Sequence, residues 1–282
     1  INHFGSIYGA AEINCIMVAP MTDTYNITIP AQARDVAAMA TELFGERLCG
    51  VYLYGSAVLG GLRPDSDIDI LIIIDGGLDD TLRAELTKRL LKLSVTVAVA
   101  HSEQRGLRPL EVTILDKNQL RPRRFPPRIE YLYGEWLRDE IEAGELPMPH
   151  ESTDLVILLR QSERHSLRLY GRERSELADP IPDSDIKRAM RAELPKLAGY
   201  LRGDEQNVLL TYYRMWYTLD AGEIVSKDEA ASWVLAKLEP DLRRPIEVAR
   251  LAYLGLCDDR GEYADTARLA VYFEEKISEL LE

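Results

Sequence analysis

The hydrophobic pattern divides the chain into a first part that alternates helix and strand and a second part that is helical. In the first part, a helical face begins after Pro30, and a leucine stripe over 82–93 predicts another helix. Apolar runs rich in β-branched and aromatic residues predict buried strands at 48–54, 68–75 and 110–115. The Pro- and Arg-rich stretch 121–128 is expected to be an ordered loop.

No strand is predicted after residue 154. Helical patterns follow at 154–170, 185–202, 205–221, 227–238, 243–256 and 264–281. The segment 178–184 has two prolines among polar residues, which favours a domain boundary. We therefore predict an α/β (α+β) domain over 1–181 and an all-helical bundle domain over 182–282. Because the chain begins with Ile1, we expect its first ~20 residues to be non-native or disordered.

The overall charge bears on the class of partner. The chain has 47 Asp and Glu against 34 Lys and Arg, and a formal net charge of −13. A general nucleic-acid binder would be basic, so we expect no nucleic-acid partner. Acidity favours cationic partners, although it also serves solubility alone. No apolar run reaches the length of a membrane span, and three scattered cysteines fit a reducing compartment, so we expect a cytoplasmic protein. We also expect a monomer.

Two aspartates open the second predicted strand. Because side chains alternate along a strand, Asp67 and Asp69 share one face while Ile68 and Ile70 face the core. Neighbouring carboxylates repel each other unless a cation lies between them, and Mg²⁺ prefers oxygen ligands. The alternative is a pair of aspartates that simply faces solvent.

The dipeptide Gly55-Ser56 stands where the first strand runs into a turn. Glycine permits close backbone approach, and free N–H groups at a helix start bind phosphate oxygens. The hydroxyl of Ser56 adds a donor, and Ser66 could supply another. An isolated Gly-Ser is usually only a turn, but here a phosphate cradle precedes a metal-binding pair by one loop.

A third carboxylate is predicted on a neighbouring strand. In the run 110–114, alternation places Glu111 on the polar face and Leu110 and Val112 inward. A glutamate there could bind the metal or take a proton from an attacking hydroxyl. The alternative is an edge glutamate in water.

These motifs resemble those of the nucleotidyltransferase superfamily, and the chain is most similar to the streptomycin/spectinomycin adenylyltransferases within it. The similarity spans roughly residues 30 to 275 and therefore both predicted domains. The stretches that carry it are 53–58, 66–69, 110–113, 125–128, 134–138, 203–205, 216–219 and 226–228. The resemblance implies a nucleotidyltransferase-type mixed sheet in the first domain.

The resemblance also implies how ATP is held. Asp67 and Asp69 would bind two Mg²⁺ ions together with the triphosphate. Ser56 and Ser66 would help to seat the phosphates, and Glu111 would be the catalytic base.

Three residues nearer the end of the chain complete the implied site. Lys227 would reach the triphosphate, and Asp204 and Trp136 would face a cationic aminoglycoside or aminocyclitol antibiotic. From the residues alone, Lys227 could be a solvated lysine behind the cap Ser226, Asp204 a structural acid at a helix start, and Trp136 a core residue.

One departure from the family pattern bears on the antibiotic. Members that handle streptomycin are expected to carry an acidic residue just before the Gly-Asp-Glu motif that starts at Gly203, where this chain has Tyr200. The departure speaks against streptomycin more than against spectinomycin. Glu193 is a residue that could substitute in space.

The sequence therefore predicts transfer of AMP from ATP to an antibiotic hydroxyl, with release of pyrophosphate. Two alternatives remain open at this point. The acceptor could be a protein side chain or another small alcohol, or the protein could be a catalytically inactive nucleotide-binding module.

Overall fold

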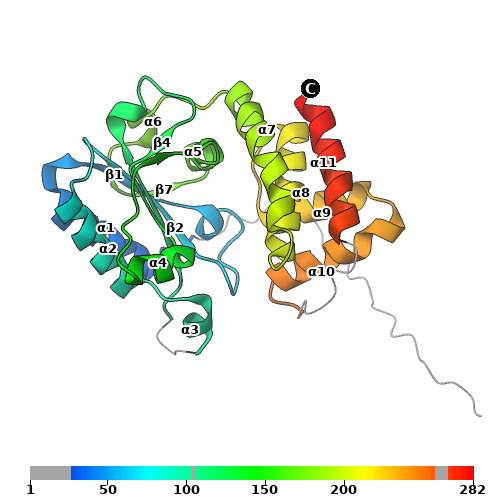
Figure 1. Cartoon of the computed structure of the whole chain (residues 1–282), viewed down its shortest axis with the longest axis horizontal. Helices are drawn as coiled ribbons and strands as arrows, with labels where there is room; N and C mark the ends of the chain where they lie inside the picture. Colours follow the sequence, from blue (N-terminus) through cyan, green and yellow to red (C-terminus); the bar gives the residue numbers. More distant parts are fainter. Residues whose placement is uncertain (1–26, 103–105, 258–265) are drawn as a thin grey trace, which may run out of the picture.

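The computed structural model describes residues 27–102, 106–257 and 266–282, which form two lobes (Figure 1). The expectation about the first ~20 residues lies outside this part of the chain. Within these ranges, no helix has both the length and the apolar character needed to cross a bilayer.

The first lobe is built on a five-stranded mixed sheet with the strand order β5-β3-β2-β1-β7. Strands β2 and β3 are parallel, and the other neighbours are antiparallel. A separate two-stranded sheet pairs β4 with β6. The strands are β1 (Leu48–Tyr54), β2 (Ile68–Ile74), β3 (Leu110–Asp116), β4 (Arg128–Ile129), β5 (Tyr131–Tyr133), β6 (His150–Glu151) and β7 (Leu167–Gly171).

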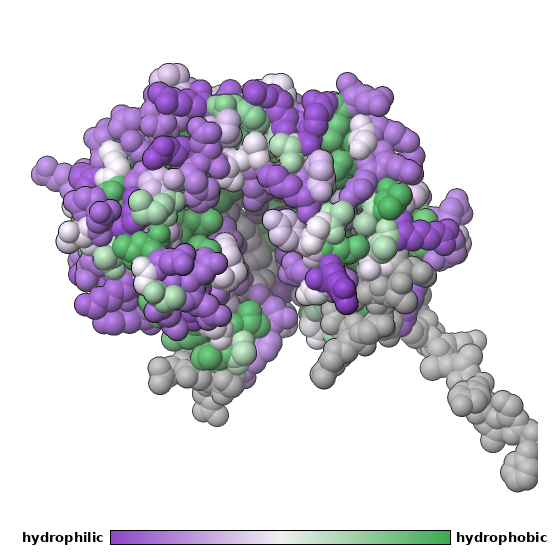
Figure 2. Space-filling view, viewed as in Figure 1, coloured by the Kyte–Doolittle hydropathy of each residue, from purple (hydrophilic) through white to green (hydrophobic). Residues whose placement is uncertain are grey.

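Alternation along the central strands gives the sheet two different apolar faces. On β2, Ile70 and Ile72 pack against helices α1 (Ala31–Phe44) and α2 (Asp80–Leu93) on the outer face. Leu71 and Ile73 point the other way, towards α5 (Leu155–Arg164) and the helical lobe. Any polar residue on the second face therefore points towards the helical lobe (Figure 1), on the side of the hollow between the lobes (Figure 2).

Three of the five strands of the main sheet were predicted, and two were missed. The helix predicted over 154–170 is wrong in its second half, because α5 ends at Arg164 and β7 pairs with β1 along the sheet edge. β7 is mostly exposed, so it lacks the apolar run that marks a buried strand. β5, also an edge strand, and the short pair β4 and β6 were missed as well.

The second lobe is a bundle of helices, as predicted. It contains α7 (Asp183–Tyr200), α8 (Glu205–Ala221), α9 (Lys227–Lys237), α10 (Arg243–Tyr253) and α11 (Thr266–Leu281). The short helices α3 (Val97–Ser102), α4 (Arg138–Glu142) and α6 (Arg174–Leu177) belong to the first part of the chain. The predicted cap is confirmed, because the Ser226 side chain accepts a hydrogen bond from the Glu229 N–H.

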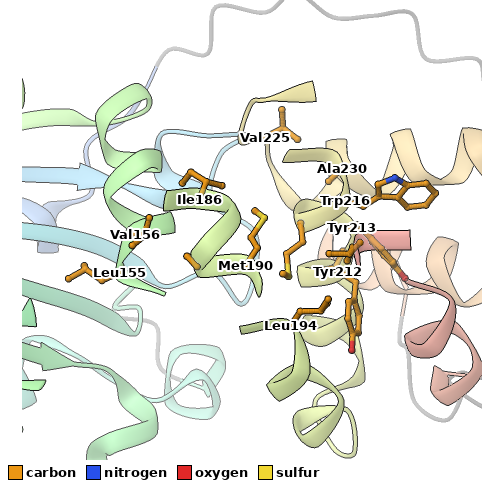
Figure 3. Packing of buried hydrophobic residues seen from close by; sticks show 14 of the residues in the cluster. Leu155, Val156, Ile186, Met190, Leu194, Tyr212, Tyr213, Trp216, Val225 and Ala230 are labelled. Carbon is orange, nitrogen blue, oxygen red and sulfur yellow. The ribbon is translucent and has the colours of Figure 1, made fainter. Parts of the chain in front are cut away.

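One hydrophobic cluster joins the two lobes. Leu155 and Val156 of α5 belong to the same cluster as Met190 of α7 and Tyr213 of α8 (Figure 3). On its other side, this cluster reaches Leu71 of the sheet. The boundary between residues 181 and 182 stays a prediction, and packing is continuous across it.

A shared core predicts that the lobes unfold together. Met190→Ala leaves a cavity in the cluster and should lower the free energy of unfolding by about 2–5 kcal/mol. Met39→Ala, in the outer cluster of the first lobe, should shift the same calorimetric transition. If the two variants shifted two separate transitions, the lobes would be independent folding units.

Candidate active site

Three polar side chains form a row across the central strands. Tyr54 pairs with Asp69 in the β1–β2 ladder, and Asp69 pairs with Glu111 in the β2–β3 ladder. Paired residues point to the same side of a sheet. The Tyr54 hydroxyl donates to Glu111 Oε1 at 3.3 Å. The predicted placement of Asp69 and Glu111 on neighbouring strands is confirmed, and the row lies on the face that points to the cleft.

Gly55 allows the backbone to lie directly against Asp69. Its φ is +65°, and a Cβ on this residue would lie 1.8 Å from Asp69 Oδ2. Any other residue would therefore push the carboxylate away in addition to straining the backbone. Gly55 and Ser56 start a 3₁₀ turn directly after β1, and the Ser56 N–H is directed at the Asp69 carboxylate.

The carboxylates disfavour one another's charge. Burial raises the pKa of Asp69, and the neighbouring charge of Asp67 raises it further. Burial and then Asp69 raise the pKa of Glu111, and burial raises that of Asp67. A positive charge among them would relieve this repulsion.

A hard divalent cation such as Mg²⁺ fits the oxygen donors of Asp67 and Asp69. In the described part of the chain, no group of three or more His, Cys, Asp or Glu residues is arranged to hold a metal. Mg²⁺ commonly takes one or two carboxylates and completes its shell with phosphate and water oxygens. The two aspartates are therefore suited to a metal that arrives with a nucleotide.

Lys227 approaches the carboxylates from the helical lobe. Burial lowers its pKa to about 8, Arg214 adds to this effect, and Asp69 and Asp67 oppose it. The structure thus brings Lys227 within electrostatic reach of the aspartates across the cleft. Lys227 is only partly exposed and its ammonium group has a protein partner, which fits a positioned lysine better than a freely solvated one.

Lys227 also has partners within its own lobe. Its Nζ donates to Asn207 Oδ1 at 3.1 Å and lies 5.6 Å from the centre of the Tyr253 ring. Asp204 accepts from Asn207 Nδ2 at 2.8 Å and does not cap α8 with its side chain. Asp204, Asn207 and Lys227 therefore form one polar chain at the edge of the cleft.

Two residues at this site were not predicted as functional. Arg214 acts on the pKa of both Asp69 and Lys227, and its buried Nε has no hydrogen-bond partner among the described residues. Tyr253 presents its ring to Lys227 and Arg63. A signal for Arg214 was available, because it is a lone charge within the apolar run 208–219 of α8.

Two of the predicted site residues, Trp136 and Ser66, have no contact with the carboxylate row among the interactions of the described residues. Trp136 is 57% exposed, so its interpretation as a core residue is wrong. Its ring packs over Gly134, where a Cβ would lie 2.3 Å from the indole. The Ser66 hydroxyl accepts from the Arg63 N–H at 2.9 Å and so is engaged within its own loop.

A cavity of about 290 Å³ opens between α5, α7 and α8. Its walls combine the apolar side chains of Met190 and Leu197 with Asp154, Glu193 and Arg214. Asp154 is near enough to raise the pKa of Glu111. The cavity therefore adjoins the carboxylate row and has acidic groups on its wall.

Comparison with known proteins gives the family. A model of the nucleotidyltransferase domain matches residues 42–121, and a model of the aminoglycoside adenylyltransferase C-terminal domain matches residues 176–276. A spectinomycin 9-adenylyltransferase of Campylobacter jejuni is 45% identical over 254 residues, covering 89% of this chain and 96% of the relative. The chain belongs to the aminoglycoside adenylyltransferase family.

Two further adenylyltransferases are similar to this chain. The aminoglycoside (3'')(9) adenylyltransferase of Escherichia coli is 38% identical over 82% of this chain and 88% of its own length. The crystal structure of a spectinomycin adenyltransferase from Enterococcus faecialis with ATP and spectinomycin superposes with a TM-score of 0.81 at 31% identity. That match covers 88% of this chain and 98% of the other.

Gly55→Ala should inactivate the adenylyltransferase, because the new Cβ displaces the Asp69 carboxylate. We expect kcat/KM to fall by more than about 100-fold. Gly45→Ala is a matched control, since Gly45 also has a positive φ but a Cβ there would meet nothing within 4 Å. Steady-state kinetics with equal activity for the two variants would contradict this role of Gly55.

Glu111→Gln should stabilise the metal-free adenylyltransferase at high pH. Because the pKa of Glu111 is raised on folding, the folded state holds its proton more tightly, and stability falls as pH rises above the ordinary value of 4.5. Glutamine removes this penalty. We expect the melting temperature to rise by about 3 °C at about pH 8.5 and by much less at about pH 5. An equal gain at both values would show that ionisation is not the cause.

Proposed function

We propose that this adenylyltransferase transfers AMP from ATP to a hydroxyl group of spectinomycin and releases pyrophosphate. The observation that carries the proposal is the row of Asp69 and Glu111 on the first lobe with Lys227 facing it from the second. Support comes from spectinomycin 9-adenylyltransferases that are 40–45% identical to most of the chain.

The nucleotide would lie between the lobes. Asp67 and Asp69 would hold two Mg²⁺ ions with the triphosphate, and the metals would supply charge neutralisation there. Lys227 and Arg214, whose buried Nε has no partner among the described residues, would contact phosphate oxygens. The turn at Ser56 would bring a further donor, and Ser66 would act by holding its loop in place.

The transfer step is an in-line displacement. Glu111 accepts the proton of the acceptor hydroxyl, and the oxygen forms a bond to the α-phosphorus. The bond from this phosphorus to the bridging oxygen breaks, and pyrophosphate leaves. Burial raises the pKa of Glu111, which strengthens the ionised carboxylate as a proton acceptor. The Tyr54 hydroxyl would keep Glu111 aligned.

The acceptor would occupy the acidic side of the cleft. Asp154 on the cavity wall suits an ammonium group, as does Asp204 at the cleft edge. The exposed ring of Trp136 would offer an apolar surface to the drug. Tyr200 is 62% exposed and supplies no carboxylate, which favours spectinomycin over streptomycin. Glu193 accepts from Thr153 and Lys196 and is thereby already engaged.

We further infer that the enzyme works as a monomer in the cytoplasm, where ATP is available, and that nucleic acid is not its acceptor. Both lobes of one chain supply the groups that the reaction needs. The acidity of the chain disfavours polynucleotides and suits a cationic drug.

The test is an assay of the purified protein with ATP and Mg²⁺, given spectinomycin or streptomycin. We expect pyrophosphate release and a gain in the mass of spectinomycin equal to one adenylyl group (AMP less water). Glu111→Gln should lower kcat by about 10²–10⁴-fold, and Asp69→Asn should abolish turnover. The exposed Glu85→Gln is the control.

The outcomes separate the alternatives. Pyrophosphate release without modified drug would point to another acceptor. ATP binding without turnover under any condition would indicate an inactive nucleotide-binding module.

A further inference from the structure

The two lobes also meet at a second, polar contact. The loop 60–66, between β1 and β2, lies against the start of α9 and the end of α10. The approach is close, because a Cβ on Gly60 would lie 2.8 Å from Ser226 Cβ, and a Cβ on Gly255 would lie 2.6 Å from Pro64 Cγ. The contact therefore joins the loop that leads to Asp67 to the turn that carries Lys227.

An ion pair lies in this contact. Arg63 Nη2 is 3.2 Å from Asp228 Oδ2, with both side chains mostly buried. The Arg63 guanidinium also lies 5.9 Å from the centre of the Tyr253 ring. Asp228 directly follows Lys227 in the first turn of α9. The position of Lys227 relative to the first lobe thus depends on this pair.

The loop on the other side of the pair is firmly held. Arg108 Nη1 donates to the carbonyl oxygens of Arg63 at 2.7 Å and Ser66 at 3.0 Å. The Arg63 N–H donates to the Ser66 hydroxyl at 2.9 Å. A movement of Arg63 would therefore move residues 63–66, which lead directly into Asp67.

The pair has unused hydrogen-bonding capacity. Arg63 Nε and Asp228 Oδ1 are both buried, and neither has a hydrogen-bond partner among the described residues. One is a donor and the other an acceptor, and they belong to the same ion pair. A small approach of the two lobes would let them form the second bond of a bidentate pair.

We propose that Arg63 and Asp228 are positioning residues that lock the helical lobe onto the catalytic loop, and that their second hydrogen bond forms when nucleotide draws the lobes together. Neither side chain touches the substrate; both act through Lys227 and Asp67. The proposal rests on the nucleotide site of the proposed function but is independent of the acceptor. The rival explanation is that Arg63 itself binds phosphate.

The two explanations predict opposite effects for Asp228. If the pair locks the lobes, Arg63→Ala and Asp228→Ala should each raise KM for ATP by about tenfold, with a smaller change in kcat. If Arg63 bound phosphate, Asp228→Ala would free the guanidinium and lower KM. Glu229→Ala is the matched control, because it removes an acid from the same helical turn without touching Arg63.

Two further variants complete the test: one exchanges the two charges of the ion pair, and the other replaces Arg63 by lysine. Arg63→Asp combined with Asp228→Arg should recover most of the affinity that each single change removes. Arg63→Lys keeps the charge but loses Nε, so its KM should lie between those of the wild type and Arg63→Ala. A failure of the reversed pair to recover, or additive losses in the double alanine variant, would overturn the proposal.

Binding of MgATP without an acceptor, measured by calorimetry, separates this proposal from the proposed function. The same order of affinities should appear there, even if spectinomycin is not modified. Binding that is unchanged in both alanine variants would overturn the positioning role.

Discussion

Electrostatic repulsion on one face of a sheet is the constraint on which the site depends. Asp69 and Glu111 are fixed side by side by the parallel β2–β3 ladder, and Asp67 directly precedes the first residue of β2. Partial burial reduces the screening of the three charges by water. A cationic ligand and the positive groups of the helical lobe relieve this cost, so the repulsion among the carboxylates favours binding of a cation. The repulsion among the carboxylates lowers the stability of the fold, and a bound cation would restore it.

The helical lobe places positive groups opposite these carboxylates, on the other side of the cleft. Lys227 and Arg214 project from helices whose apolar sides share a core with α5 and, through it, with the sheet. The charged groups therefore stand on two rigid supports that meet in one hydrophobic cluster. Their separation is then set by packing at one end of the cleft and by the Arg63–Asp228 pair at the other.

Much of this arrangement could be predicted from the residues. The three central strands are marked by dense apolar runs, and the pattern Asp67-Ile68-Asp69-Ile70 shows which side chains share a face. Glu111 could be placed by the same alternation. Strand β7 could not, because an exposed edge strand has no strong pattern, and its partner β1 is more than a hundred residues away. The row that includes Tyr54 required the register between strands, which sequence periodicity does not contain.

The residues of the helical lobe were harder for a different reason. Arg214 stands out as a charge in an apolar helix, but only the packing of the lobes reveals what it faces. Trp136 follows a helical pattern and is nevertheless exposed, and its ring lies over Gly134. Local pattern determines which elements form, whereas the cleft is made by elements distant in the chain.

The core that runs from the sheet through α5 into α7 and α8 has a consequence for how such enzymes diversify. Recombination at the linker before α7 would separate side chains that have been fitted to one another. The helical lobe is therefore poorly suited to exchange as a unit between relatives. Exposed positions such as Tyr200, at the end of α7, are not constrained by this packing. We therefore expect the range of drugs that these enzymes modify to evolve by point substitutions at exposed positions, where a new side chain changes the stability of the fold little.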